Sequence, residues 1–227
     1  MKISVLTSVT GAKDALIAPY TPSTAEFIAY TDNSAVNNHW TLREAYNRFK
    51  DPRRNSRIHK MLSHLYCDTE YSIWADGNIE LLQPPEYFIE NFLKDHDIAM
   101  FIHQTRDCIY DEAMTCAKSG LDDPEVIIKQ VKKYEQEGFG KHKGLYVGNF
   151  IIRRHTPKVI AFNNAWWAEY CAHSVRDQIS LPYCLDKVGL RINAVESPWN
   201  IAQDGSHAFR GNFIKIYPHL ILNPPIR

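Results

Sequence analysis

The feature that most restricts the fold of this chain is the alternation of short apolar runs with longer amphipathic stretches. Runs of strand length occur at residues 3–7, 27–31, 71–79, 98–103, 146–153, 190–195 and 213–217. Apolar residues spaced three or four positions apart predict helices at residues 37–51, 57–66, 84–93, 124–136 and 166–185, the first of them ended by Asp51-Pro52. Because alternating strands and helices form mostly parallel sheets covered on both faces, the sequence predicts an α/β/α sandwich.

Length and charge narrow the class of protein further. The chain has 227 residues, which fits one large α/β domain better than two small ones. Its 26 basic and 26 acidic residues balance, and no charged tail points to nucleic acid or to an anionic membrane. The first residues, MKISVLTSV, are too few for a signal peptide, and no apolar run reaches the roughly 20 residues of a membrane span. The five cysteines form no CxxC pair, so we expect free thiols in a reducing, cytoplasmic setting.

Polar side chains follow four of the predicted strands. They lie at residues 8–11, 32–33, 76–78 and 103–106. In parallel sheets, ligands bind beyond the carboxyl ends of the strands. The sequence therefore predicts a binding site at this edge of the sheet.

Asp76 and Asn78 are the candidate metal ligands at that edge. The predicted strand that contains Trp74 ends at Asp76, and a Gly turn places Asn78 two residues later. Their oxygens would suit Mg²⁺ or Mn²⁺, which would stabilise a leaving nucleoside diphosphate. A plain Asp-Gly turn between two strands explains the same residues equally well. We expect Trp74 to lie beside the donor molecule that carries this diphosphate.

Two basic pairs are candidates for binding the donor. Arg57 and Lys60 lie about one helical turn apart, ahead of the predicted strand that ends at Asp76. Both side chains could face phosphates or simply solvent. His103 and Arg106 follow the predicted strand at residues 98–103. His103 could bind the donor sugar or transfer a proton, and a capping or core histidine is the alternative.

The segment that begins at Trp166 is rich in aromatic and acidic residues. If it is helical, Glu169, His173 and Asp177 lie near one face. Trp166 and Trp167 could then stack on a sugar ring beside a carboxylate that acts as a base. An amphipathic helix with an internal salt bridge is the alternative.

Taken together, the motifs resemble one protein family. They read YTDN, RIHKMLSHLYCDTEYSIWADGNIEL, FIHQTRDCIYDEA, IIKQVKKYEQEGF, LYVGNFIIRRH and WWAEYCAHSVRDQISLPYCL, in that order, over residues 27–185. This series resembles the glycosyltransferase-like domain family that includes plant mucilage-biosynthesis proteins and stand-alone bacterial and viral domains. The resemblance implies the type-A nucleotide-sugar transferase fold, with a metal motif at the end of a central strand.

The resemblance also implies roles for individual residues. Asp32 would face the donor base or ribose, Asp76 would take the metal-motif position, and Asn78 would stand where an acid is ideal. Residues 1–105 would form the nucleotide-binding half of a single domain, and residues 106–227 the acceptor half.

Two further assignments come from the same resemblance. Asp177 and Gln178 resemble an Asp-Gln pair that lies near the donor sugar and acceptor in such enzymes. His207 would match a late metal-binding histidine, although a histidine in a loop often has no such role.

We therefore expect a glycosyltransferase that moves a sugar from a UDP-linked donor to a glycan or other acceptor with Mn²⁺ or Mg²⁺. One alternative is a metal-assisted hydrolase of lipids or phosphoesters that uses Asp76 and His103, although the sequence lacks a dense set of His and Asp ligands. Another is an inactive carbohydrate-binding module, which would not need the candidate acids Asp177 and Glu169.

Overall fold

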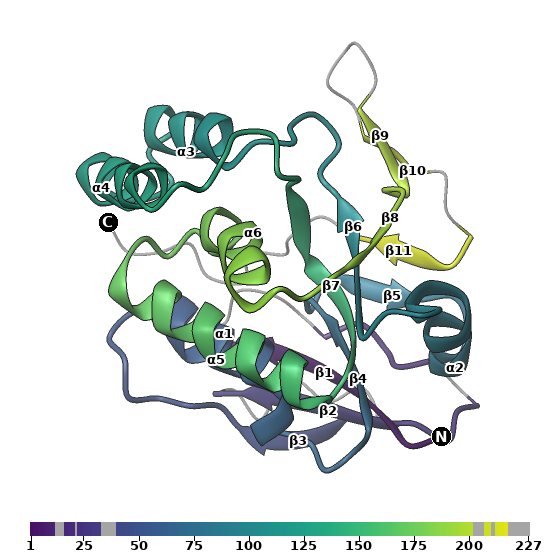
Figure 1. Ribbon diagram of the computed structural model, residues 1–227. Coiled ribbons are helices and arrows are strands. Elements are labelled where there is room, and N and C mark those ends of the chain that lie inside the picture. The colour runs from purple at the N-terminus through teal and green to yellow at the C-terminus, as the bar shows by residue number, and fades with distance from the viewer. Residues whose placement is uncertain (12–15, 21, 33–39, 202–206, 210–211, 218–227) are drawn as a thin grey trace.

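The computed structural model describes residues 1–11, 16–20, 22–32, 40–201, 207–209 and 212–217, and its centre is a seven-stranded sheet (Figure 1). The strand order is β3-β2-β1-β4-β7-β6-β8. The strands are β1 (Ile3–Val9), β2 (Glu26–Thr31), β3 (Thr41–Glu44), β4 (Tyr71–Ala75), β6 (Ile98–Ile102), β7 (Tyr146–Arg154) and β8 (Asn193–Val195). Only β7 runs antiparallel to its neighbours, β4 and β6, so the predicted mostly parallel sheet is confirmed for the described residues.

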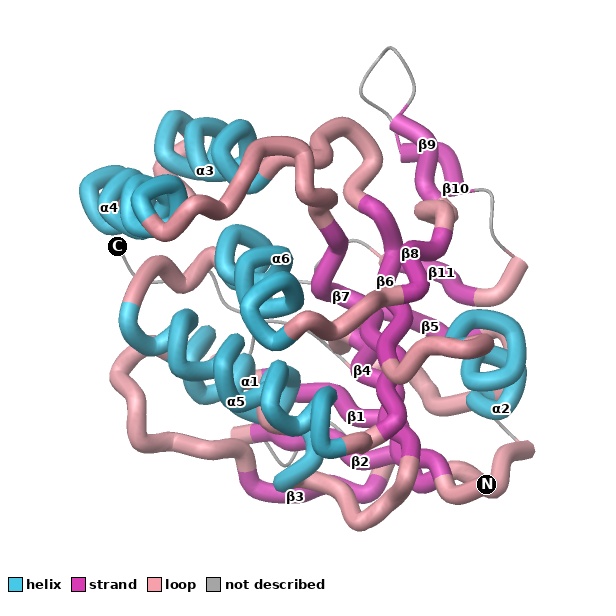
Figure 2. Tube along the Cα trace, viewed as in Figure 1, coloured by secondary structure: helices cyan, strands magenta, loops and turns pink. Residues whose placement is uncertain are grey.

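Helices and a small sheet cover the two faces (Figure 2). On one face lie α1 (Pro52–Met61), α5 (Pro157–Ala172) and α6 (Asp177–Val188), and next to α6 pack α3 (Ile109–Lys118) and α4 (Pro124–Gln136). On the other face lie α2 (Pro85–Phe88), the π-helical turn η2 (Ile89–Leu93) and the strands β5 (Ile79–Leu81) and β11 (Ile214–Ile216). The remaining elements are a 3₁₀ turn, η1 (Ser63–Leu65), and the strand pair β9 (Trp199–Ile201) and β10 (His207–Phe209). No helix within the described ranges is both long and apolar enough to span a membrane.

Three helices begin with the same local signal. Asp51, Asp123 and Thr156 each accept a backbone N–H through the side chain, and a proline follows each of them. The capping oxygen satisfies an N–H without a helical partner, and proline suits the first helical position. These signals fix where α1, α4 and α5 start.

Two predicted elements are wrong near the start of the chain. Residues 41–44 form the edge strand β3 rather than part of a helix, because β3 pairs parallel with β2. The Trp40 ring packs edge-on against Phe27 at 5.3 Å, which anchors the strand. Asp51-Pro52 begins α1 instead of ending a helix, so α1 starts earlier than predicted and ends at Met61.

The stretch at residues 166–185, expected to form one helix, is divided between two. The break at residues 173–176 is held by Asp122, which accepts hydrogen bonds from Ser174 Oγ at 2.7 Å and Val175 N at 2.8 Å. Likewise, the strand predicted at residues 71–79 is split between β4 and β5, which belong to different sheets. Helix α3 was not predicted.

Candidate active site

The end of β4, the middle of α1 and the start of α6 meet at the Arg57 guanidinium. Its Nη1 lies 3.8 Å from Asp76 Oδ1, and its Nε lies 3.5 Å from Asp177 Oδ2. Burial acts to lower the pKa of Arg57, but the two carboxylates outweigh it and raise that pKa. The Arg57 side chain is 28% exposed.

Behind Arg57, Lys60 forms a buried ion pair with Asp177. Lys60 is only 1% exposed, and its ammonium donates to Asp177 Oδ2. Burial acts to raise the pKa of Asp177, but Lys60 and Arg57 outweigh it and hold that pKa well below its usual range. Asp177 also opens α6, where the helix dipole favours a negative charge. It is therefore an ionised carboxylate near neutral pH.

The first half of β7 packs against the Lys60–Asp177 pair. A Cβ on Gly148 would lie 2.8 Å from Lys60 Nζ, so a larger residue at this position would push the Lys60 ammonium out of its present place in the pair. The next residue, Asn149, accepts the backbone N–H of Asp76 through its carbonyl oxygen at 2.9 Å. We did not identify either residue from the sequence, because their roles depend on the antiparallel pairing of β7.

The structure corrects the expectation for Trp74. Its ring is fully buried, and its indole Nε1 donates to Asp76 Oδ1 at 2.7 Å. Trp74 therefore orients Asp76 from the core and does not lie against the donor.

Of the predicted metal ligands, Asp76 fits a cation best. Its side chain is 21% exposed, and the hydrogen bond from Trp74 goes to Oδ1, with none to Oδ2 from another described residue. The prediction that Asn78 is a metal ligand is corrected by the structure. Asn78 is 8% exposed, and its amide Nδ2 donates to the Tyr217 carbonyl oxygen at 2.7 Å, beside the pairing of β5 with β11. His207 lies on β10, and its side chain is outside the described part.

Within the described residues, no three His, Cys, Asp or Glu side chains converge on one point. Mg²⁺ in nucleotide enzymes is often held by one or two carboxylates, with phosphate and water oxygens completing its coordination. A cation held in that way would have Asp76 as its protein ligand.

The other candidate donor contacts lie along the same edge. Asp32 follows β2, and its Oδ2 accepts the Gly11 backbone N–H at 2.8 Å, which ties together the ends of β1 and β2. His103 follows β6, where its Nδ1 accepts the Arg106 N–H at 3.2 Å. Arg106 pairs with Glu112 of α3 at 2.7 Å. Burial lowers the pKa of His103, so it is neutral near pH 7.

Trp166, expected to stack on a sugar, is fully buried. Its Nε1 donates to the Asp177 carbonyl oxygen at 3.0 Å, so Trp166 supports Asp177 from the core. Trp167 is half-buried, and its ring lies 5.8 Å from the Tyr170 ring. Gln178 is also half-buried and donates to the Tyr146 carbonyl oxygen at 3.1 Å.

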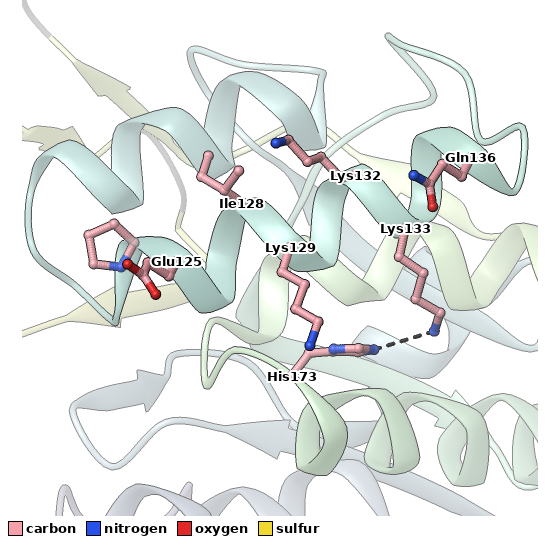
Figure 3. Close-up of a pocket in the computed structure, with 8 residues that line it drawn as sticks. Glu125, Ile128, Lys129, Lys132, Lys133, Gln136 and His173 are labelled. Carbon is pink, nitrogen blue, oxygen red and sulfur yellow. Dashed lines mark hydrogen bonds between the residues drawn. The ribbon is translucent and has the colours of Figure 1, made fainter.

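Glu169 does not share a face with Asp177, because the two residues lie on different helices. Its carboxylate accepts from Lys133 Nζ and from Tyr134 Oη, both at 2.8 Å, and lies 3.3 Å from His173 Nε2. Glu169 therefore has a structural partner, but that partner is Lys133 of α4. Burial lowers the pKa of His173, so the predicted salt bridge within the helix does not form near pH 7. A cavity of about 690 Å³ lies beside this cluster (Figure 3). It is lined by Pro124, Glu125, Ile128, Lys129, Lys132, Lys133, Gln136 and His173, which places it away from Asp76 and Asp177.

Comparison with known families identifies the domain. The family model described as TOD1/MUCI70, glycosyltransferase-like domain, matches residues 25–212. The chain belongs to this family. The resemblance inferred from the motifs is thereby confirmed.

Two relatives of the family and one solved structure extend the comparison. The probable hexosyltransferase MUCI70 of Arabidopsis thaliana is 31% identical over 156 residues, which cover 64% of this chain and 27% of the relative. The alkaline ceramidase TOD1 of Arabidopsis thaliana is 25% identical over 163 residues, which cover 66% of this chain and 35% of the relative. The chain thus spans about a third or less of the length of these relatives.

The solved structure shows the fold. The bifunctional glycosyltransferase WbbM in its apo form matches with a TM-score of 0.51 and 13% identity, covering 88% of this chain and 39% of that one. The fold of the family member described here is thus a glycosyltransferase-like α/β fold.

Proposed function

We propose that this chain transfers a sugar from a UDP-linked donor to a glycan or other acceptor, assisted by a divalent cation at Asp76. The observation that supports it most is the position of Arg57 between Asp76 and Asp177 at the carboxyl edge of the sheet. This edge is where open α/β sheets bind their ligands. Family membership supports glycosyl transfer as the reaction class.

In this proposal the donor diphosphate lies against Arg57 and Asp76. The guanidinium of the partly exposed Arg57 side chain donates charge-assisted hydrogen bonds to the phosphate oxygens. The nucleoside lies towards Asp32 and Gly11, at the ends of β2 and β1. A cation bound at Asp76 would neutralise charge on the leaving nucleoside diphosphate.

Asp177 holds the donor sugar in this proposal and does not act as the base. A general base works best when its pKa lies near the working pH. Lys60 and Arg57 keep the pKa of Asp177 far below that range, so its carboxylate is a weak proton acceptor. It remains a strong hydrogen-bond acceptor for a sugar hydroxyl.

An Arg57→Gln variant tests the donor site. The loss of a hydrogen bond to a charged group should weaken UDP binding by about 1.5–3 kcal/mol, which corresponds to roughly a tenfold to hundredfold rise in Kd. Isothermal titration calorimetry with UDP in Mn²⁺ measures this change. The matched control is Arg53→Gln, because Arg53 lies on the same helix, is exposed and pairs with Asp51. Equal UDP affinity in wild type and Arg57→Gln would refute the donor site.

A second candidate function has a specific observation behind it. The relative TOD1 is named an alkaline ceramidase, and the sequence also allowed a hydrolase that uses Asp76 and His103. Incubating the protein separately with UDP-sugars and with ceramide distinguishes these reactions. Release of UDP supports glycosyl transfer, release of fatty acid supports the hydrolase, and binding of glycan with neither product supports an inactive module.

A further inference from the structure

Arg153 of β7 is a fully buried cation. Within the described part of the chain, no carboxylate lies within ion-pair distance of it, and its Nε and Nη2 have no hydrogen-bond partner. Burial lowers its pKa to about 9. An unpaired cation is costly to bury, so a residue that keeps one there calls for a specific explanation.

The contacts of Arg153 lie at the end of α1. Its Nη1 donates to the Lys60 carbonyl oxygen at 2.8 Å and to Ser63 Oγ at 3.0 Å. Lys60 belongs to the last turn of α1, where carbonyl groups lack helical partners and the helix dipole favours a positive charge. Arg153 therefore fixes the backbone from which the Lys60 side chain extends.

Trp166 connects this backbone contact to the candidate active site. The Arg153 guanidinium and the Lys60 ammonium both lie over the Trp166 ring, at 5.9 Å and 5.6 Å from its centre. The Nε1 of the same ring donates to the Asp177 carbonyl oxygen at 3.0 Å. One buried ring thus contacts both members of the Lys60–Asp177 pair and the cation that holds one of them.

We propose that Arg153 is a positioning residue that sets the geometry of the Lys60–Asp177 pair through the end of α1 and the Trp166 ring. Its effect on sugar transfer rests on the proposed function, which assigns Asp177 to the donor sugar. The geometric part, that Arg153 holds Lys60 in place, does not depend on the reaction.

The test replaces Arg153 with methionine, which keeps an apolar stem and removes both the cation and the donated hydrogen bonds. The matched control is Arg154→Met, because Arg154 is the next residue of β7, is exposed, and donates to Tyr71 Oη rather than to α1. Arg153→Lys is the conservative variant, since it keeps a charge near Trp166 but lacks the guanidinium Nη1 that donates both hydrogen bonds. Circular dichroism and thermal unfolding establish which variants are folded.

The first readout does not require activity. An amine-specific reagent followed by mass spectrometry measures how fast Lys60 is modified in each folded variant. We expect slow modification in wild type and Arg154→Met, faster modification in Arg153→Met, and an intermediate rate in Arg153→Lys. If Arg153→Met does not fold, the comparison rests on Arg153→Lys, and a wild-type rate in it would overturn the proposal.

The second readout is sugar transfer. A small displacement of a catalytic group costs about a hundredfold in rate, so kcat should fall by about that factor in Arg153→Met, with UDP affinity nearly unchanged and part of the rate restored in Arg153→Lys. A folded Arg153→Met variant with wild-type Lys60 modification and wild-type kcat would overturn the proposal. If wild type transfers no sugar but Lys60 modification changes as expected, the positioning role stands and the proposed function fails.

Discussion

A Lys60→Met variant is expected to lose about 3–5 kcal/mol of unfolding free energy, because removing one partner of a buried ion pair is costly and leaves Asp177 with only its longer contact to Arg57. Lys60 is 1% exposed, and it makes the largest contribution of the nearby charges that keep Asp177 ionised in the core. Urea denaturation followed by circular dichroism measures the loss. The matched control is Lys132→Met on the exposed side of α4, which should change stability little.

The loss should also depend on pH in a defined direction. The depressed pKa of Asp177 contributes stability that is present above its unfolded pKa of about 3.9 and is lost as the pH falls through the folded value. The difference in unfolding free energy between wild type and Lys60→Met should therefore become smaller as the pH falls below about 4. Adding Asp177→Leu to Lys60→Met should recover part of the stability, because a buried apolar pair has no charge to desolvate. A Lys60→Met loss below about 1 kcal/mol at pH 7 would contradict the buried pair.

Asp177→Asn is expected to weaken binding of the complete sugar donor while leaving UDP binding nearly unchanged. Asparagine keeps the shape of the side chain and loses the charged acceptor, which costs about 1.5–3 kcal/mol for a hydrogen bond to a sugar hydroxyl. Calorimetry with the non-transferable donor and with UDP measures both affinities. Asp186→Asn, on the exposed side of the same helix, is the control.

The kinetics of Asp177→Asn distinguish the two roles left open by the sequence. A base at this position would lower kcat by about 10²–10⁴-fold with donor affinity unchanged. A sugar ligand changes donor affinity itself. Normal turnover together with normal donor affinity would mean that Asp177 serves only the structure of α6.

Local signals in the sequence were enough for much of the fold. The predicted helix at residues 124–136 agrees with α4 because Asp123 and Pro124 mark its start. The runs that became β4, β6 and β7 are apolar enough to identify from sequence. Asp76 lies at the end of a central strand, as predicted, because the strand runs directly into the turn.

Contacts between distant segments decided the remaining features. The break before α6 depends on hydrogen bonds to Asp122, more than 50 positions earlier. Lys60 and Asp177 lie 117 positions apart, so no spacing rule pairs them. The burial of Trp166 is set by the packing of α5 on α1, whereas its sequence neighbours suit an exposed ring equally well. The positions of the candidate residues on a shared edge of the sheet were therefore predictable as a group, but the partners of their side chains were not.

The measurement that tests the central claim most directly is calorimetric titration of UDP into wild type and Asp76→Ala, each with and without Mn²⁺. Asp68→Ala, which removes an exposed carboxylate elsewhere, is the control, and circular dichroism checks that each variant is folded. We predict that Mn²⁺ tightens UDP binding in wild type and Asp68→Ala but not in a folded Asp76→Ala. Equal UDP affinity in all three proteins, unaffected by Mn²⁺, would contradict a cation-assisted donor site at Asp76.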